Sequence, residues 1–197
     1  MTSRRALQSV LAATVFTGLA AGTPLFAQTK VEDKAFVSGG KVDVHLEAGD
    51  YEVRASRDNH VRVTLSGDMG NTVAEVVVKD RNADVVVRKT PSSSKTFHVV
   101  IEVPKVSDVA IRLSAGDLDV DDITGSKDIE MNAGDLKIVT GNPDSYSKVD
   151  ASVGIGDLSA GPFGNTKGSF LSKSVTYAGK GKHTLRARLS VGDLKLQ

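Results

Sequence analysis

The feature that most constrains this chain is a change of side-chain face that recurs at a Gly-Asp dipeptide. Around each dipeptide, apolar and polar residues alternate with the period of two that is typical of β-strands. Leu113 and Ala115 share one face of such a strand, whereas Leu118 belongs to the opposite phase. A strand cannot move its apolar residues to the other face without a bend, bulge or turn. The sequence therefore predicts a β-corner at Gly116-Asp117.

The same eight-residue pattern occurs five times. In it, Gly-Asp is flanked on each side by two apolar residues that are separated by one residue of any type, and one apolar residue of each pair adjoins the dipeptide. Glycine tolerates the positive φ of a sharp bend, and aspartate accepts hydrogen bonds from nearby backbone N–H groups. The predicted structural corner residues are Gly49, Asp50, Gly116, Asp117, Gly134, Asp135, Gly156, Asp157, Gly192 and Asp193. Replacing Gly116 or Gly134 by valine should then cost roughly 1–3 kcal/mol, the usual cost of a strained backbone.

Alternation elsewhere predicts an all-β fold, because 42–46, 61–65, 97–103 and 109–113 place apolar residues at every second position and no helical spacing follows Ala27. Two architectures remain open. The dipeptides are either corners of a β-solenoid, a β-helix-like stack, or two-residue loops in an antiparallel β-sandwich or meander of hairpins, with Ala115 paired to Leu118. The last four corners are 18, 22 and 36 residues apart, which favours stacked repeats with one degenerate copy in 165–180.

Residues 1–27 are typical of a cleavable signal peptide. Arg4 and Arg5 form a basic n-region, an apolar stretch of small residues runs over 10–21, and Ala27 is a suitable residue before a cleavage site. The apolar stretch is short for a membrane span, and an uncleaved anchor is the alternative. The sequence therefore predicts export to the periplasm or cell surface of a bacterium, with no membrane insertion after cleavage.

The remaining chain divides by the density of corners. Residues 28–104 contain one copy and long polar interruptions, whereas 105–197 contain four. We expect a less regular β part over 28–104 that is continuous with a β-repeat part over 105–197. Because the chain has no cysteine, its stability must come from hydrogen-bonded ladders and apolar burial.

Composition excludes several classes of function. Without Arg4 and Arg5, the 25 basic residues become 23, against 24 acidic ones, so there is no electrostatic case for binding nucleic acid or an anionic membrane surface. The chain has no tryptophan and only 5% aromatic residues, which argues against a carbohydrate-stacking platform.

Motifs for metal or catalytic chemistry are also incomplete. The run from Asp117 to Asp122 resembles a calcium loop but holds aspartate at the sixth position, where an EF-hand needs glycine. The corner aspartates either form a ladder for a cation or cap their own corners, and capping is favoured because Gly-Asp is a turn signal without any ligand. The histidines, at 45, 60, 98 and 183, are dispersed, and no GxSxG or phosphate-loop motif occurs. We predict no catalytic residue, metal site or cofactor.

A family resemblance adds to this interpretation. The stretch 99–120, VVIEVPKVSDVAIRLSAGDLDV, resembles the putative-adhesin family of bacterial envelope proteins, domain of unknown function 4097 (DUF4097). In that family a strand ends in proline, an alternating strand follows, and a small-Gly-Asp-apolar corner recurs downstream. The resemblance covers roughly 35–197 and is strongest from Glu102 to Ile138. It implies a β-solenoid-like fold, an exported location and no catalytic residues, and the irregular spacing after Asp157 departs from it.

Three functions follow from these observations. The leading prediction is a non-catalytic, adhesin-like structural or interaction module that binds an envelope or surface protein through strand faces or edges. The alternative is a periplasmic sensor or modulator whose ligand docks on 31–104. An enzyme with a site on a solenoid face ranks below both, because it needs a column of acids or bases beside a groove.

Overall fold

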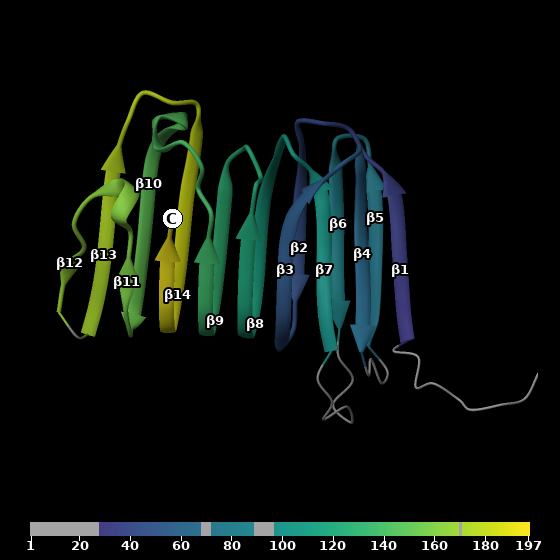
Figure 1. Cartoon of the computed structure of the whole chain (residues 1–197), viewed down its shortest axis with the longest axis horizontal. Helices are drawn as coiled ribbons and strands as arrows, with labels where there is room; N and C mark the ends of the chain where they lie inside the picture. The colour runs from purple at the N-terminus through teal and green to yellow at the C-terminus, as the bar shows by residue number, and fades with distance from the viewer. Residues whose placement is uncertain (1–27, 68–71, 89–96, 170) are drawn as a thin grey trace, which may run out of the picture.

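The computed structural model describes residues 28–67, 72–88, 97–169 and 171–197, so the predicted signal peptide lies outside the described residues. These ranges contain fourteen strands, two 3₁₀ turns and no α-helix, which confirms the prediction of an all-β fold (Figure 1). The strands are β1 (Gln28–Ala35), β2 (Gly40–Leu46), β3 (Gly49–Ser56), β4 (His60–Gly67), β5 (Val73–Lys79), β6 (Asn82–Arg88), β7 (Phe97–Pro104), β8 (Ser107–Asp121), β9 (Lys127–Ile138), β10 (Tyr146–Ile155), β11 (Leu158–Ser159), β12 (Lys167–Gly168), β13 (Leu171–Ala178) and β14 (His183–Leu196). The turns are η1 (Pro143–Ser145) and η2 (Gly161–Phe163).

All strands belong to one open sheet whose centre is the parallel, in-register set β8, β9 and β14. The sheet forks at β8. The part of β8 before its corner pairs with β2, which continues through β6 to β5 and makes a three-strand branch. The part after the corner pairs with β3, which continues through β7 and β4 to β1 and makes a four-strand branch. Since β2 and β3 both pair with β8, the sheet is continuous across residues 104 and 105.

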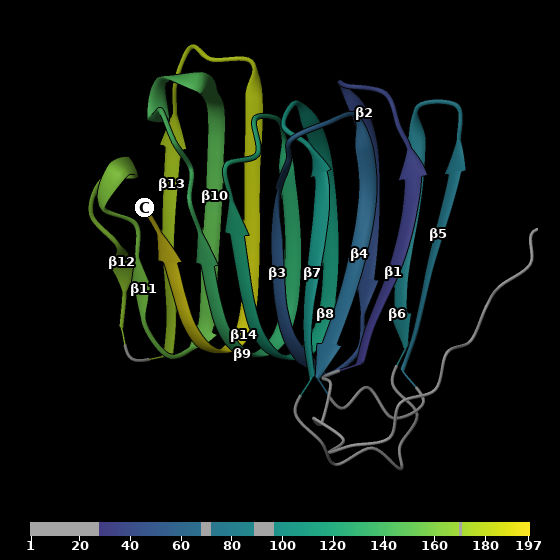
Figure 2. The same cartoon turned by 45° about the vertical axis from the view of Figure 1, so that its right-hand side comes forward.

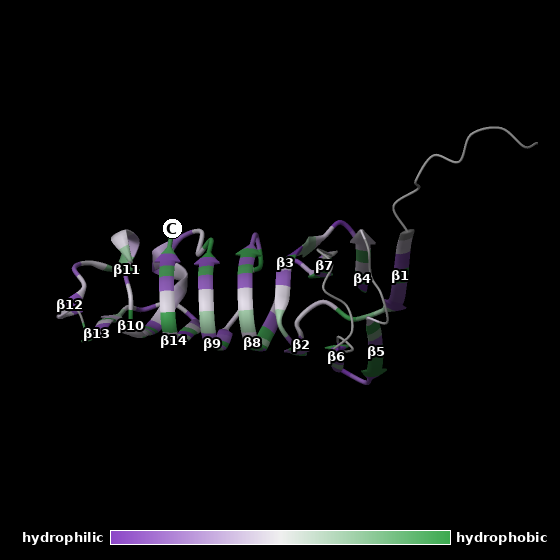
Figure 3. Cartoon of the chain, turned by 90° about the horizontal axis from the view of Figure 1, so that it is seen from below, coloured by the Kyte–Doolittle hydropathy of each residue, from purple (hydrophilic) through white to green (hydrophobic). Residues whose placement is uncertain are grey.

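The two branches lie as two layers with the core between them (Figure 3). Every second residue of β2 faces this core, so Val42, Val44 and Leu46 are buried while Asp43 and His45 are not. The same holds across the other branch for 61–65 and 99–103. Burial on one face of each layer is the arrangement that period-two alternation predicts. A two-layer sandwich is compatible with this packing.

The Gly-Asp dipeptides are not hairpin loops. Gly116 and Asp117 lie inside β8, which continues from Ser107 to Asp121, and Ala115 and Leu118 pair with different residues of β9. The hairpin alternative is therefore wrong at these corners, because the strand bends and continues instead of reversing.

The expected degenerate corner in 165–180 is also wrong. Residues 171–178 form β13, which runs antiparallel to β10 at the edge of the sheet. The chain leaves the stack after β9, forms β10 to β13, and returns with β14, which inserts between β9 and β10. The 36-residue interval in the sequence therefore reflects this excursion and not two successive coils.

Candidate functional site

The predicted corner residues come together in a single row. Gly49 is in register with Gly116, Gly116 with Gly134, and Gly134 with Gly192. A Cβ on Gly156 would meet the Gly192 carbonyl oxygen at 1.9 Å, so the corner at Gly156 lies directly beside the corner at Gly192. The order in space thus differs from the order in the sequence, because the last corner of the chain lies between the third and fourth.

The close approach of successive corners explains why they hold glycine. Gly116 and Gly134 have φ values of +121° and +120°, a conformation that side chains disfavour. In addition, a Cβ on Gly134 would lie 1.8 Å from the carbonyl oxygen of Gly116. Each corner therefore presses its backbone against that of the next, and any side chain at the glycine would push the strands apart.

The corner aspartates form an exposed row on the outside of the bends. Adjacent strands are about 4.8 Å apart, so their carboxylates are close neighbours. The Asp193 carboxylate accepts a hydrogen bond of 3.0 Å from the backbone N–H of Asp157, and Lys173 pairs with the Asp157 carboxylate. Asp193 therefore caps the neighbouring corner, not its own. Within the described ranges, no group of three or more acidic, His or Cys side chains is arranged to hold a metal ion.

A row of exposed apolar residues runs beside the corners. Val191 of β14 is in register with Ile155 of β10, which in turn faces Leu171 of β13. All three are exposed, and Leu171 keeps 64% of its surface accessible. Alternation alone places these positions with the buried residues, but the bend at each corner turns them outward.

A buried cationic group lies at Lys127, at the start of β9. Its side chain is only 1% exposed, and its ammonium donates to the Ile123 carbonyl at 2.7 Å and to the Tyr146 hydroxyl at 2.9 Å. Burial lowers the pKa of Lys127 to about 8, and burial also raises the pKa of Tyr146 to about 12. A signal for this residue is present in the sequence, because Lys127 shares the alternation phase of Ile129 and Met131.

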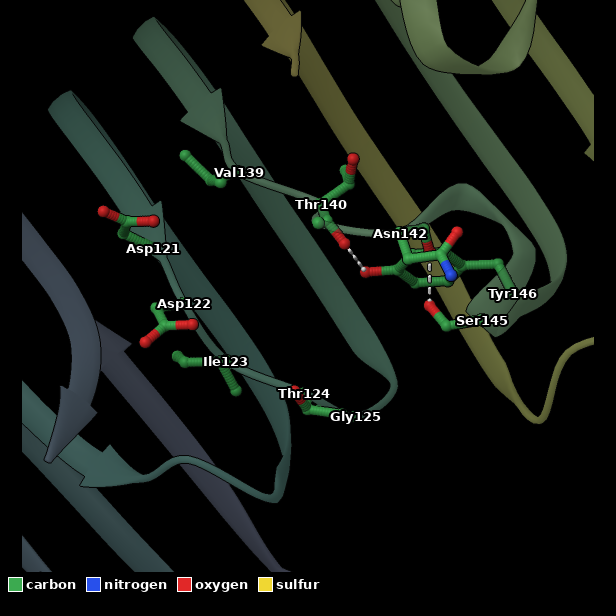
Figure 4. A pocket seen from close by; sticks show the side chains of 11 residues that line it. Asp121, Asp122, Ile123, Thr124, Gly125, Val139, Thr140, Asn142, Ser145 and Tyr146 are labelled. Carbon is green, nitrogen blue, oxygen red and sulfur yellow. Dashed lines mark hydrogen bonds between the residues drawn. The ribbon is translucent and has the colours of Figure 1, made fainter. Parts of the chain in front are cut away.

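A cavity of about 490 Å³ lies beside Tyr146, between the loops that follow β8 and β9 (Figure 4). Tyr146 lines it and donates from its hydroxyl to the Thr140 carbonyl at 3.2 Å, and Asp121, Asp122 and Asn142 also line it. Because Tyr146 is buried, it offers the cavity no aromatic face for stacking.

A network of ion pairs covers the outer face of the four-strand branch. Arg62 contacts Glu102 at 3.1 Å and Asp33 at 3.1 Å, and Arg54 contacts Glu102 at 3.2 Å. The hydrogen bonds that Arg62 donates, to Glu102 first and to Asp33 and Asp58 next, raise the pKa of Arg62. The hydrogen bond between His60 and Asp33 lowers the pKa of Asp33. These pairs link β1, β4, β7 and β3 side by side.

Replacing Glu102 by glutamine is expected to lower the free energy of unfolding by about 1 kcal/mol, because one carboxylate serves two guanidinium groups. The loss should shrink in high salt, which screens exposed charges. Urea unfolding at low and high ionic strength measures it. The control is Asp119→Asn, which removes a single exposed pair with Lys137 at 3.6 Å and should change stability little. Equal effects of both substitutions would contradict the role of the network.

Comparison with known proteins gives a likeness in fold. No family model matches the chain, and no curated protein matches it either. Among solved structures, a "putative cell adhesion protein" from Clostridium sporogenes ATCC 15579 superposes with a TM-score of 0.57 at 13% identity, over 86% of this chain and 98% of that one. A "putative adhesin" from Bacteroides fragilis NCTC 9343 covers the same share of this chain and 97% of its own at 14% identity, but its TM-score is only 0.31. The first comparison shows a shared fold.

Within the described ranges, no helix is long and apolar enough to cross a membrane. Membership of the DUF4097 family stays a prediction.

Proposed function

We propose that this chain is an exported, non-catalytic protein of the bacterial envelope that acts as an adhesin-like structural and interaction module. The observation that carries the proposal is the open sheet, which leaves long outer faces and unpaired strand edges accessible. Exposed edges and faces of this kind bind other polypeptides through main-chain hydrogen bonds and side-chain complementarity. The shared fold with a protein named for cell adhesion supports the same class of function.

In this proposal the central strands form a β-solenoid-like stack. Parallel, in-register pairing of β8, β9 and β14 repeats one bent unit, and each unit buries its apolar face against the next. The partner is an envelope or surface protein, and the mature chain begins at Gln28 after signal cleavage. No residue of the module acts as an acid, base or nucleophile.

Protease treatment of intact bacteria, compared with permeabilised cells, tests the proposal. We expect the protein to be digested on intact cells, and its N-terminal sequence to begin at Gln28. A deletion strain should then attach less well to its surface or to other cells. Protection until the outer membrane is opened would overturn a surface role, and an N-terminus at Met1 would overturn export by cleavage.

A second candidate, a periplasmic sensor or modulator, is favoured by one cavity of about 650 Å³ in the 31–104 part. Its lining includes Arg54, Arg57 and Arg62, of which Arg57 has no ion pair within the described ranges. Guanidinium groups recognise carboxylate and phosphate, so the ligand would be a small anion. A rise in melting temperature with citrate or phosphate that is lost in Arg57→Ala would favour this function over the first.

A further inference from the structure

We propose that the free edge of β5 binds an extended, acidic segment of a partner protein as an added strand. This inference rests on the proposed function, because it assumes that the chain acts through its strands. It goes further by naming one edge of the sheet and the chemistry of the segment that fits it.

The backbone of β5 has an open side. β5 pairs with β6 and with no other strand in the described ranges. The two strands are joined by Asp80-Arg81, and Asp80 has the positive φ of 55° that suits a two-residue hairpin. In such a hairpin alternate residues turn their N–H and C=O groups away from the partner strand, here Ala74, Val76 and Val78. These groups form the hydrogen-bonding edge for another strand.

The last strand of the opposite layer, β1, lies next to β5. The branch that ends in β5 has three strands beyond β8, whereas the branch that ends in β1 has four. β1 contacts β5 across the layers, and the two strands lie side by side at the outer end of the stack (Figures 2 and 3). A strand added to the free edge of β5 would therefore lie at this end of the stack, close to β1.

The side of β1 that faces this position is charged. Lys30, Glu32 and Lys34 are paired with Leu65, Val63 and Val61 of β4, whose side chains are buried, so the three charged residues point toward the core side of the sheet. Charged residues that point inward are a common protection of edge strands. Lys30 pairs with Glu32 at 3.6 Å, while Lys34 has no ion pair within the described ranges. An added strand with carboxylates on this side would neutralise the excess positive charge.

The outer side of β5 carries two valines that alternate with Glu75 and Lys79. Val73 and Val77 keep 53% and 49% of their surface exposed. Residues directly opposite each other on adjacent strands stabilise a sheet when both are apolar or β-branched. The partner segment should therefore alternate carboxylates, which face β1, with apolar residues, which lie beside Val73 and Val77.

A second copy of the chain fits this edge poorly. Its own β5 would bring Ala74, Val76 and Val78 against the lysines of β1, which places apolar side chains opposite charge. A separate extended segment with carboxylates at these positions does not meet this obstacle.

The test uses the mature protein and two acetylated seven-residue peptides, one alternating glutamate with valine and one alternating lysine with valine. Both offer the same backbone and the same apolar face. Fluorescence anisotropy at low salt should show that the acidic peptide binds roughly tenfold tighter, since two or three extra charge contacts are worth about 1.4 kcal/mol. Amide NMR shifts on binding should concentrate in β5 and β1.

Three variants make the test specific. Lys34→Glu should reverse the preference between the peptides, whereas Lys182→Glu, at an exposed residue of the opposite end, should leave it unchanged. Val78→Pro removes an N–H from the edge and should weaken both peptides. An unchanged preference in Lys34→Glu, or NMR shifts elsewhere, would overturn the proposal.

Sedimentation of the peptide-free protein completes the test. A monomer is expected, and a dimer that Val78→Pro abolishes would assign the edge to a second copy and overturn the proposed partner. If the protein is exposed on intact cells but binds neither peptide, the inference about β5 fails while the proposed function stands. If the protein binds the acidic peptide but is protected from protease inside the envelope, the inference about β5 stands while the proposed surface role fails.

Discussion

Replacing Gly134 by alanine is expected to lower the free energy of unfolding by about 3 kcal/mol or more. Strain alone at φ +120° accounts for roughly 1–3 kcal/mol. The added Cβ would also lie 1.8 Å from the Gly116 carbonyl oxygen, and that oxygen belongs to the backbone of the neighbouring strand. It cannot move aside without disturbing the pairing of β8 with β9, so the steric term adds to the strain.

Equilibrium unfolding in urea measures the effect, with Gly161→Ala as the matched control. Gly161 has no atom within 4 Å of a Cβ and no positive φ, so the same chemical change should cost little there. Gly192→Ala should resemble Gly134→Ala, because its Cβ would meet the Gly134 carbonyl oxygen at 1.9 Å. Similar stabilities of the Gly134 and Gly161 variants would show that the corners do not constrain the stack.

Local sequence patterns predicted much of this fold because they reflect local geometry. The alternation of 42–46 and of 109–113 gave the strand faces correctly, and the phase change around Gly116 marked where β8 bends. These features depend on residues a few positions apart, and their spacing follows from the pleat of a strand.

The order of the strands could not be predicted in the same way. The segments around Gly134, Gly156 and Gly192 have the same pattern, so each could stack on any other. What decides is the route of the chain through η1, η2 and β13, which places the C-terminal strand between β9 and β10. The order of strands depends on loop paths and long-range packing, and period-two alternation carries no information about either.

The candidate surfaces were missed for a related reason. Val191, Ile155 and Leu171 belong to apolar patterns, yet the bends expose them. The free edge of β5 depends on which strands find no neighbour, and the unequal branches depend on the fork at β8. Neither property belongs to any single segment of the sequence.

Removing the side chain of Lys127 is the second substitution with a large expected effect. Lys127→Ala should lower the free energy of unfolding at pH 7 by about 2–4 kcal/mol, because it opens a cavity and leaves the Ile123 carbonyl without its donor. Lys127→Met keeps the volume and removes the charge, so it should cost much less, since replacing a buried charge by an apolar isostere is often nearly neutral.

The pH dependence separates charge from packing. The pKa of Lys127 is about 8 in the folded protein and near 10.5 in the unfolded chain, so between these values the unfolded chain binds more protons. Stability should therefore rise between pH 8 and 10, by at most about 1.4 kcal/mol per pH unit. Above pH 10 it should fall, because burial raises the pKa values of Tyr146 and Tyr51 and the unfolded chain loses those protons first.

Urea unfolding at several pH values from 7 to 11 measures both the rise in stability and the fall above pH 10. Lys127→Met should abolish the rise between pH 8 and 10 and keep the fall above pH 10. Tyr146→Phe should reduce the fall while retaining most of the rise. If Lys127→Met leaves the rise unchanged, another group titrates in that range and the buried ammonium is not its source. If Lys127→Met is as unstable as Lys127→Ala, the hydrogen bonds of the ammonium matter more than the volume it fills.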